Sequence, residues 1–275
     1  LNMGSISTSN VTSMKQMFAQ TDRLGKLDFG YEFDTRKVRD MGEMFKETNL
    51  LNIEFPGSFS TENVMDAHEM FAYSIKLQSL NLKTFNTKNM KVYSMMFMGM
   101  TALTSLDISN FDTSNATSLK YMFAGCSKLS SLNVSKFSTG KVVTMRGMFQ
   151  GLRGISSLNL TGFRTIAVTD MNSMFEEFGN IENPPLLNFS SFSTVNVKDM
   201  TKMFHSASLE SLDVSGFSTI NVTSIESMFE STMVKSINAT NFNLAKVTNL
   251  NYVFKQSTAV SIDIDHWQVG DLKEM

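Results

Sequence analysis

The sequence predicts an α/β repeat solenoid, and three observations predict it. The dipeptide Met-Phe recurs along the whole chain at a nearly constant interval. Within each copy, a short segment that alternates apolar and polar residues, as strands do, precedes a segment whose apolar residues have helical spacing. The composition is also skewed, with 22 Met and 23 Phe but one Trp, five Tyr and three Pro among 275 residues. Such a skew indicates one motif copied many times.

The Met-Phe pairs define the copies. They lie at residues 17–18, 44–45, 70–71, 96–97, 122–123, 148–149, 174–175, 203–204 and 228–229, and Val253-Phe254 is a degenerate tenth copy. By subtraction, successive Phe residues are 27, 26, 26, 26, 26, 26, 29, 25 and 25 residues apart. A second Phe series lies between them, and Trp267 takes its tenth place after Phe33, Phe59, Phe85, Phe111, Phe137, Phe163, Phe192, Phe217 and Phe242. We therefore expect Trp267 to fill a Phe position.

The clearest copy, residues 129–151, predicts the elements of all the others. Residues 132–135 alternate apolar and polar side chains, which is typical of a short strand with one buried face. Thr144 then precedes a predicted helix of about two turns as its cap. The apolar residues of that helix fall at i, i+3, i+6 and i+7, namely Val142, Met145, Met148 and Phe149. Each copy is thus predicted to be a strand, a turn with Phe, a short helix and a loop.

One such unit has no second layer to cover its apolar side, so the copies are expected to stack on one another. Strands of successive coils would pair in parallel at about 4.8 Å, which gives about 48 Å over ten steps. Flexible Met side chains suit small mismatches between coils. We predict a right-handed solenoid of the leucine-rich-repeat type, with about ten coils of 25–29 residues, a parallel sheet on one side and short helices on the other.

The repeats predict a single domain, residues 1–275, with one irregular loop at residues 176–185. All three prolines lie in irregular copies, and Pro184-Pro185 falls in the 29-residue step. Neither end carries the polar cap that solenoids need. We therefore expect the chain to be a piece of a longer array.

Charge and cysteine content exclude several classes of protein. With 24 basic and 26 acidic residues, the formal charge is 24 − 26 = −2, which argues against nucleic-acid binding. One cysteine excludes an internal disulfide framework. No apolar run approaches the ~18 residues of a membrane span. We expect wall or membrane contact only through regions that flank this sequence.

The run S-L-D-I-S-N-F-D-T-S-N-A-T-S-L-K-Y-M-F-A-G-C-S-K-L, residues 105–129, closely resembles the repeat of BspA-type leucine-rich-repeat surface proteins of bacteria. That repeat is similar to L-x-x-L-D-x-S-x-F-D-T-S-x-V-x-x-M-x-x-M-F-x-x-C. The match extends over essentially the whole chain, although only Cys126 occupies the cysteine position and the last copies are short. The resemblance implies an extracellular protein, wall- or lipid-anchored at the bacterial cell surface, with a role in adhesion. It implies no catalytic residues and no particular ligand.

Candidate catalytic and metal-binding residues are few. Cys126 stands where other copies have Met100, Leu152 or Ala207, so we interpret it as a small structural residue rather than a nucleophile or ligand. The three histidines, His68, His205 and His266, occupy different positions of the repeat and form no metal-binding spacing, so we interpret them as surface residues. We predict no catalytic residues, no metal and no cofactor.

The outward strand positions form two polar columns. One contains Asp28, Glu54, Asn81, Asp107, Asn133, Asn159, Asn188, Asp213, Asn238 and Asp263, and the other is mainly serine. Only Asp28 and Glu54 bring carboxylates into adjacent coils, which favours a solvated ladder over a calcium or acid–base site. A ligand-contact surface is the alternative. Our candidate contacts there are Ser105, Asp107, Ser131, Asn133, Ser157 and Asn159, with Tyr73, Tyr93 and Tyr121 on the helix side.

Two other series have competing interpretations. One threonine per coil (Thr35, Thr61, Thr87, Thr113, Thr139, Thr165, Thr194 and Thr219) suggests either an ice-binding column or residues for turns and helix caps, and we favour the second. Sequons at Asn10, Asn115, Asn133, Asn159, Asn188, Asn221 and Asn238 suggest glycosylation or simply the repeat's own chemistry, which we favour.

We therefore expect a non-enzymatic binding or adhesion module whose partner is a surface or matrix protein of a host or neighbouring cell. Its mechanism would be avidity over many equivalent weak contacts. The alternative is a structural spacer that presents another domain away from the cell surface. An enzyme would need a pocket, for which a continuous stack offers little place except the loop at residues 176–185.

Overall fold

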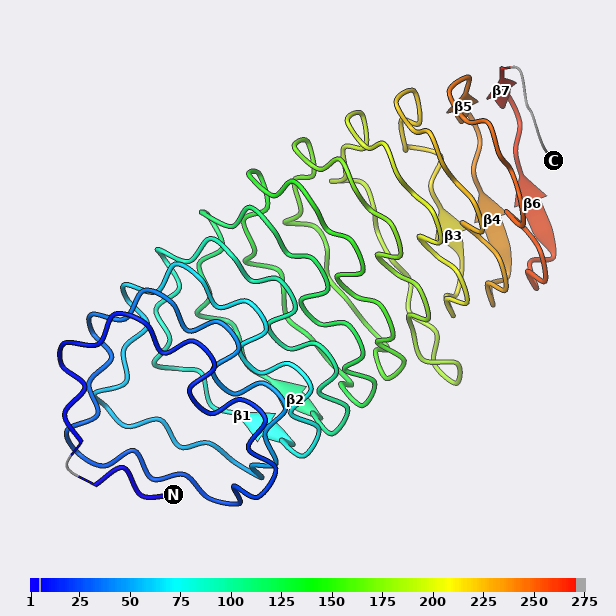
Figure 1. Cartoon of the computed structure of the whole chain (residues 1–275). Coiled ribbons are helices and arrows are strands. Elements are labelled where there is room, and N and C mark those ends of the chain that lie inside the picture. Colours follow the sequence, from blue (N-terminus) through cyan, green and yellow to red (C-terminus); the bar gives the residue numbers. More distant parts are fainter. Residues whose placement is uncertain (5, 271–275) are drawn as a thin grey trace.

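Residues 1–4 and 6–270 are described by the computed structural model, and they form an elongated stack of coils (Figure 1). Each coil is one copy of the repeat, and every paired strand joins residues one copy apart, such as Ser79 with Ser105. This parallel register, repeated step by step, indicates a repeat solenoid. The remaining residues of the predicted domain, 5 and 271–275, lie outside the described part, and the right-handed winding stays a prediction.

The strands are short and form three separate parallel sheets (Figure 1). β1 (Ser79–Leu80) pairs with β2 (Ser105–Leu106). β4 (Ser236–Asn238) lies between β3 (Leu212–Asp213) and β6 (Ser261–Asp263). β5 (Asn243–Leu244) pairs with β7 (Gln268–Val269). The predicted sheet is therefore present only in pieces among the described residues.

The strands end early because their polar residues turn the chain. The Oδ1 atom of Asp107 accepts the N–H of Ser109 at 3.1 Å, and the equivalent bond from Thr161 to Asn159 is 3.0 Å. Asn133, Asn188, Asp213 and Asp263 accept the N–H two residues later in the same way. Such side-chain turns compete with strand pairing and limit each strand to two or three residues.

The prediction of short helices is wrong for the described residues, whose only regular elements are strands. In residues 145–152, Met148, Gln150 and Leu152 donate their N–H groups to carbonyls three residues earlier, as in turns. The alternate donors, Met145, Gly147, Phe149 and Gly151, bond instead to carbonyls of the next coil at 2.8–3.0 Å. We call this segment, and its equivalent in each coil, the double turn.

Left-handed residues explain why the double turn is not a helix. Gly147 has a φ of 58° and Gly151 a φ of 68°, and most other double turns likewise carry two positive-φ residues four apart. A left-handed residue in every turn interrupts a right-handed helix. Met145, Met148 and Phe149 are nevertheless fully buried, as a helix would have placed them. The apolar spacing alone therefore did not distinguish the two backbones.

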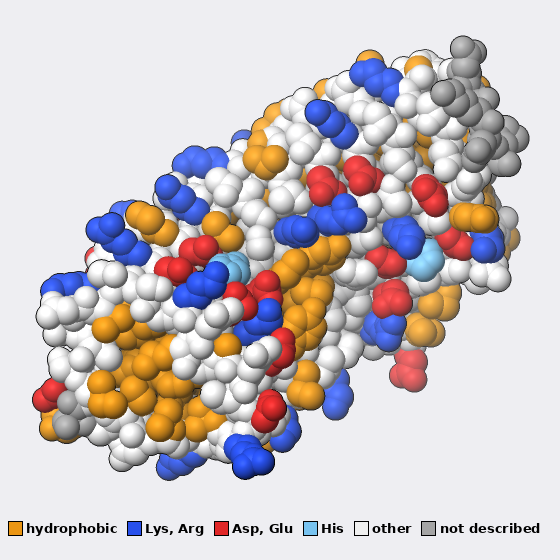
Figure 2. Space-filling model, viewed as in Figure 1, with side chains coloured by type: hydrophobic (Ala, Val, Ile, Leu, Met, Phe, Trp, Pro, Cys, Tyr) orange, Lys and Arg blue, Asp and Glu red, His pale blue; other side chains and the backbone are white. Residues whose placement is uncertain are grey.

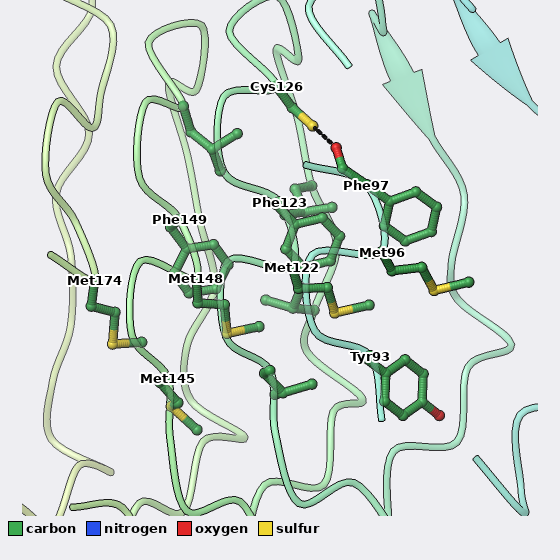
Figure 3. Packing of buried hydrophobic residues seen from close by; sticks show 14 of the residues in the cluster. Tyr93, Met96, Phe97, Met122, Phe123, Cys126, Met145, Met148, Phe149 and Met174 are labelled. Atoms are coloured by element: carbon green, nitrogen blue, oxygen red, sulfur yellow. Dashed lines mark hydrogen bonds between the residues drawn. The ribbon is translucent and has the colours of Figure 1, made fainter. Parts of the chain in front are cut away.

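Phenylalanine and methionine columns fill the interior, and Figure 3 shows Met96, Met122 and Met148 side by side in successive coils. The Phe rings of the double turns are nearly parallel, with centroids 5.7 Å apart for Phe97 and Phe123 and 6.1 Å apart for Phe123 and Phe149. Such pairs contribute about 0.5–1.5 kcal/mol each beyond burial. Trp267 stacks on Phe242 at 5.8 Å, which confirms that it fills a Phe position.

A buried threonine joins each coil to the next. The hydroxyl of Thr139 donates to the carbonyl of Arg164 at 3.0 Å and accepts the N–H of the same residue at 2.8 Å. The other predicted members of the series also donate to the following coil at 2.7–3.1 Å. All are buried, so they present no ice-binding column. Their turn role is confirmed, since Val142 donates to the carbonyl of Thr139 at 3.0 Å, but their helix-capping role is wrong.

The same holds for Thr144, for which no helix follows. Its hydroxyl accepts the N–H of Arg146 at 3.3 Å within the double turn.

The irregular loop begins later than predicted. Glu177 still donates its N–H to His205 of the next coil at 2.8 Å, and Phe178 is fully buried. The extra residues of the 29-residue step follow the double turn, where Ile181 is 70% exposed and Leu186 62% exposed. The predicted start at residue 176 is wrong because the double turn must be complete to bond the next coil.

We call the buried threonines that bond the next coil the threonine ladder. It predicts a loss of stability that depends on which threonine is replaced. Thr139→Val leaves the N–H and carbonyl of Arg164 without their hydrogen-bond partner. We therefore expect the free energy of unfolding to fall by about 1–3 kcal/mol. Urea-induced unfolding followed by circular dichroism measures the change. Thr12→Val is the control, because Thr12 is exposed and its hydroxyl has no hydrogen bond among the described residues. Equal effects of the two substitutions would contradict the ladder.

The left-handed positions predict a stabilising substitution. Ser206 has a φ of 56° and uses its N–H, not its side chain, to bond Glu230 at 2.8 Å. Ser206→Gly is expected to raise the thermal stability by about 1 kcal/mol, because glycine adopts this backbone without strain. Ser130→Gly, at an exposed residue with ordinary φ, should instead destabilise slightly. A loss of stability in both variants would refute the backbone assignment.

Candidate binding surface

The predicted strand-face residues lie together on one exposed side of the stack. Ser105, Ser131 and Ser157 are exposed, and their hydroxyls make no hydrogen bond among the described residues. Leu132 pairs with Leu158 in parallel, which sets the serines of these coils one step apart. This column of free hydroxyls is the part of the predicted surface that is available for a ligand.

The second column, of Asp and Asn residues, is exposed, but its side chains already accept hydrogen bonds from the backbone. Asp107, Asn133 and Asn159 each use Oδ1 to accept the backbone N–H two residues later. The hydroxyl and N–H of Ser109 lower the pKa of Asp107 below its usual value. A ligand at these residues would compete with the turns that end the strands.

Sequence reasoning missed Leu186, which takes the serine position of the outward column. It is 62% exposed and lines a shallow depression with Phe189, Asp213 and Phe217. The signal was the 29-residue step, which marks where the regular column is interrupted.

Of the three candidate tyrosines, Tyr93 is wrong as a surface contact. It is fully buried at the inward position that Leu119 and Met145 take in later coils. Its hydroxyl donates to the carbonyl of Asp112 at 2.9 Å, and burial raises its pKa. Tyr73 is 40% exposed, and Tyr121 is half-buried with its hydroxyl accepting Nε–H of Arg146 at 3.1 Å.

Cys126 is fully buried, and its thiol donates to the carbonyl of Phe97 at 3.0 Å (Figure 3). Burial raises the pKa of this thiol to about 12. A thiol that is both enclosed and protonated is a poor nucleophile. The position is structural, as its place in the repeat indicates.

This environment predicts that Cys126 resists alkylation. We expect iodoacetamide at pH 8 to leave the native protein unmodified and to label it fully in urea, as measured by mass spectrometry. Native labelling as fast as labelling of the unfolded chain would contradict the burial of Cys126.

Two of the three histidines, predicted to be surface residues, are half-buried and contact carboxylates. His68 lies between Asp66, 2.8 Å from Nδ1, and Glu43, 3.4 Å from Nε2. His205 lies between Glu176 and Glu230, at 3.4 and 3.9 Å. His266 is exposed. Within residues 1–4 and 6–270, no group of three His, Cys, Asp or Glu side chains is placed to hold a metal ion.

Glu43 is the centre of the charged cluster around His68. It accepts the amide of Gln16 at 3.0 Å and contacts Lys46 at 3.2 Å. These bonds, with that of His68, lower the pKa of Glu43 from 4.5 to about 2.

A lowered folded-state pKa stabilises the fold above the unfolded-state value and loses this effect as the pH falls toward the folded value. Glu43→Gln should therefore cost about 1 kcal/mol at pH 7, a value reduced by solvent screening. The difference from the unchanged protein should disappear between pH 4.5 and about 2 in thermal melts. Glu62→Gln, at an exposed carboxylate, is the control, and a cost that persists at pH 2 would contradict the assignment.

Sequon asparagines take part in the stack itself. The amide of Asn115 donates to the carbonyl of Lys88 at 3.0 Å, and its oxygen accepts Nζ of Lys141 at 2.9 Å. Asn221 bridges three coils likewise, through Val195 and Lys246. These contacts favour the repeat's own chemistry as the reason for the sequons.

In the described part of the chain, no helix has the length and apolar character to cross a membrane. A family model described as Mycoplasma protein of unknown function, DUF285, matches four overlapping stretches, residues 1–79, 31–131, 73–184 and 153–267. Repeated matches along one chain agree with the stacked copies. No curated protein and no solved structure matches the chain.

Proposed function

We propose that this chain, which belongs to the DUF285 family of Mycoplasma proteins of unknown function, is a non-enzymatic binding and adhesion module. Its partner in this proposal is a surface or matrix protein of a host or neighbouring cell. The proposal includes an extracellular place at a bacterial cell surface, through wall or lipid anchoring. The resemblance of the repeat to BspA-type leucine-rich repeats supports both parts.

The observation that carries the proposal is the exposed column of Ser105, Ser131 and Ser157. Their hydroxyls are free and are repeated at the spacing of the coils. Equivalent groups at a fixed spacing allow many weak contacts to act together, so that affinity grows with the number of coils engaged.

A spacer that presents another domain is the second candidate, and the elongated stack favours it (Figure 1). A rigid rod separates its two ends without any contact on its sides. The two candidates differ in whether this chain binds anything itself.

The test is binding of the immobilised chain to fibronectin, laminin, collagen and whole epithelial cells. We expect binding that Ser105→Lys/Ser131→Lys/Ser157→Lys reduces by about tenfold or more, because lysines would disrupt a matched polar column. The matched control is Ser114→Lys/Gly140→Lys/Ile166→Lys, at the turn that precedes the double turn in three consecutive coils.

Absence of binding to every probe would reject the adhesion proposal in favour of the spacer. Binding that both triple variants leave unchanged would reject the strand face as the contact surface.

A further inference from the structure

On the double-turn side of the stack, the fourth of the ten double turns is uncharged. Residues 92–101 contain no charged side chain, and Met95 and Met98 are half-buried there. Tyr73 of the preceding coil reaches over Gly99 and places its hydroxyl 3.5 Å from Sδ of Met98. Tyr121 of the following coil lies over Gly147 in the same way, one coil further from Met98. We call Tyr73, Met95, Met98 and Tyr121 together the apolar strip. Figure 2 shows apolar side chains gathered between the two histidines of this face.

The strip lies between flanks of opposite charge. The double turns of the two preceding coils, residues 40–49 and 66–75, carry one base and five acids, so their charge is 1 − 5 = −4. The base is Lys46, and the acids are Asp40, Glu43, Glu47, Asp66 and Glu69. The two following coils, residues 118–127 and 144–153, carry three bases and no acid, which gives +3 (Lys120, Arg146 and Arg153). Each flank therefore has an excess of charges of one sign. Several of these charges also pair within the chain: Arg146 lies 3.9 Å from Asp170, Arg153 contacts Glu177, and Lys46 lies 2.7 Å from Glu69.

These charges match when two copies of the face meet with their stacks antiparallel. A two-fold axis through residues 92–101 turns residues 66–75 toward residues 118–127 of the other copy. It also turns residues 40–49 toward residues 144–153. Each acidic flank then meets a basic flank twice, and Met95 and Met98 meet their own equivalents. A parallel arrangement would instead bring like charges together.

Self-complementarity of this kind is what a two-fold interface requires, since one patch must fit itself. Apolar side chains at the centre and charges at the edge are the usual arrangement of such an interface. Because one chain supplies both flanks at equal distances from residues 92–101, a second copy fits better than a partner of a single charge sign.

We propose that the apolar strip binds a second copy of this chain, forming an antiparallel two-fold dimer centred on Met95 and Met98. This inference does not depend on the adhesion proposal, which concerns another side of the stack.

The first test is sedimentation equilibrium of the 275-residue chain over a range of concentrations and salt. We expect a monomer–dimer equilibrium that weakens with salt, because the charges at the edge are solvated. Met98→Asp should raise the dissociation constant by about tenfold or more, since it faces its own equivalent. Met233→Asp, at a half-buried methionine five coils away, should leave it unchanged.

The second test is charge exchange. Glu69→Lys and Lys120→Glu should each weaken the dimer, and the double variant should restore it, because Glu69 of one copy faces the coil of Lys120 in the other. Within one chain these residues are two coils apart, so restoration reports contact between copies.

The third test is cross-linking. Met98→Cys should form a disulfide between copies on oxidation, whereas Met233→Cys should not, and Cys126 is buried and does not compete. A chain that stays monomeric at its highest soluble concentration would overturn the proposal. So would a dimer that Met98→Asp leaves intact, or one in which residue 98 fails to cross-link.

Discussion

The stack depends on alternate backbone N–H groups of the double turn, which find no acceptor in their own coil. Tyr121, Phe123 and Gly125 donate to the carbonyls of residues 146, 148 and 150 at 2.8, 3.1 and 2.8 Å. A buried N–H without a partner costs about 1–3 kcal/mol, and each double turn has several. A single coil therefore leaves much of its backbone unsatisfied, and the next coil supplies what is missing.

This constraint also places the side chains in register. Because the donors must meet carbonyls of the next coil, Phe lies on Phe and Met on Met, and the threonine hydroxyls reach the following backbone. The 29-residue step shows which part of the coil keeps its position when residues are added. Phe175 and Phe204 still stack at 5.6 Å across it, while the additional residues lie outside the double turn. The exposed serine column and the apolar strip lie on two outward faces of the stack, and both repeat with this register.

Much of this could be predicted from the sequence, because a repeat fixes which positions face inward. The period, the stacking, the place of Trp267 and the structural role of Cys126 follow from it. The helices were wrong because two successive turns bury residues at the same spacing as a helix, and only the backbone φ distinguishes them. The prediction of Tyr93 as a surface contact was wrong because this aromatic residue stands at an inward position where most copies have an apolar, non-aromatic one. The threonine ladder was missed because its bonds join residues one coil apart, which no local pattern reveals.

The hydrogen bonds between coils are tested most directly by measuring scalar couplings across them by NMR on the deuterated protein. If the double turns bond to the next coil, couplings are expected from the N–H groups of Tyr121, Phe123 and Gly125 to the carbonyl carbons of Arg146, Met148 and Gln150. Couplings from Phe123 to the carbonyl carbon of Leu119, four residues earlier, would show a helix instead and contradict the bonding between coils.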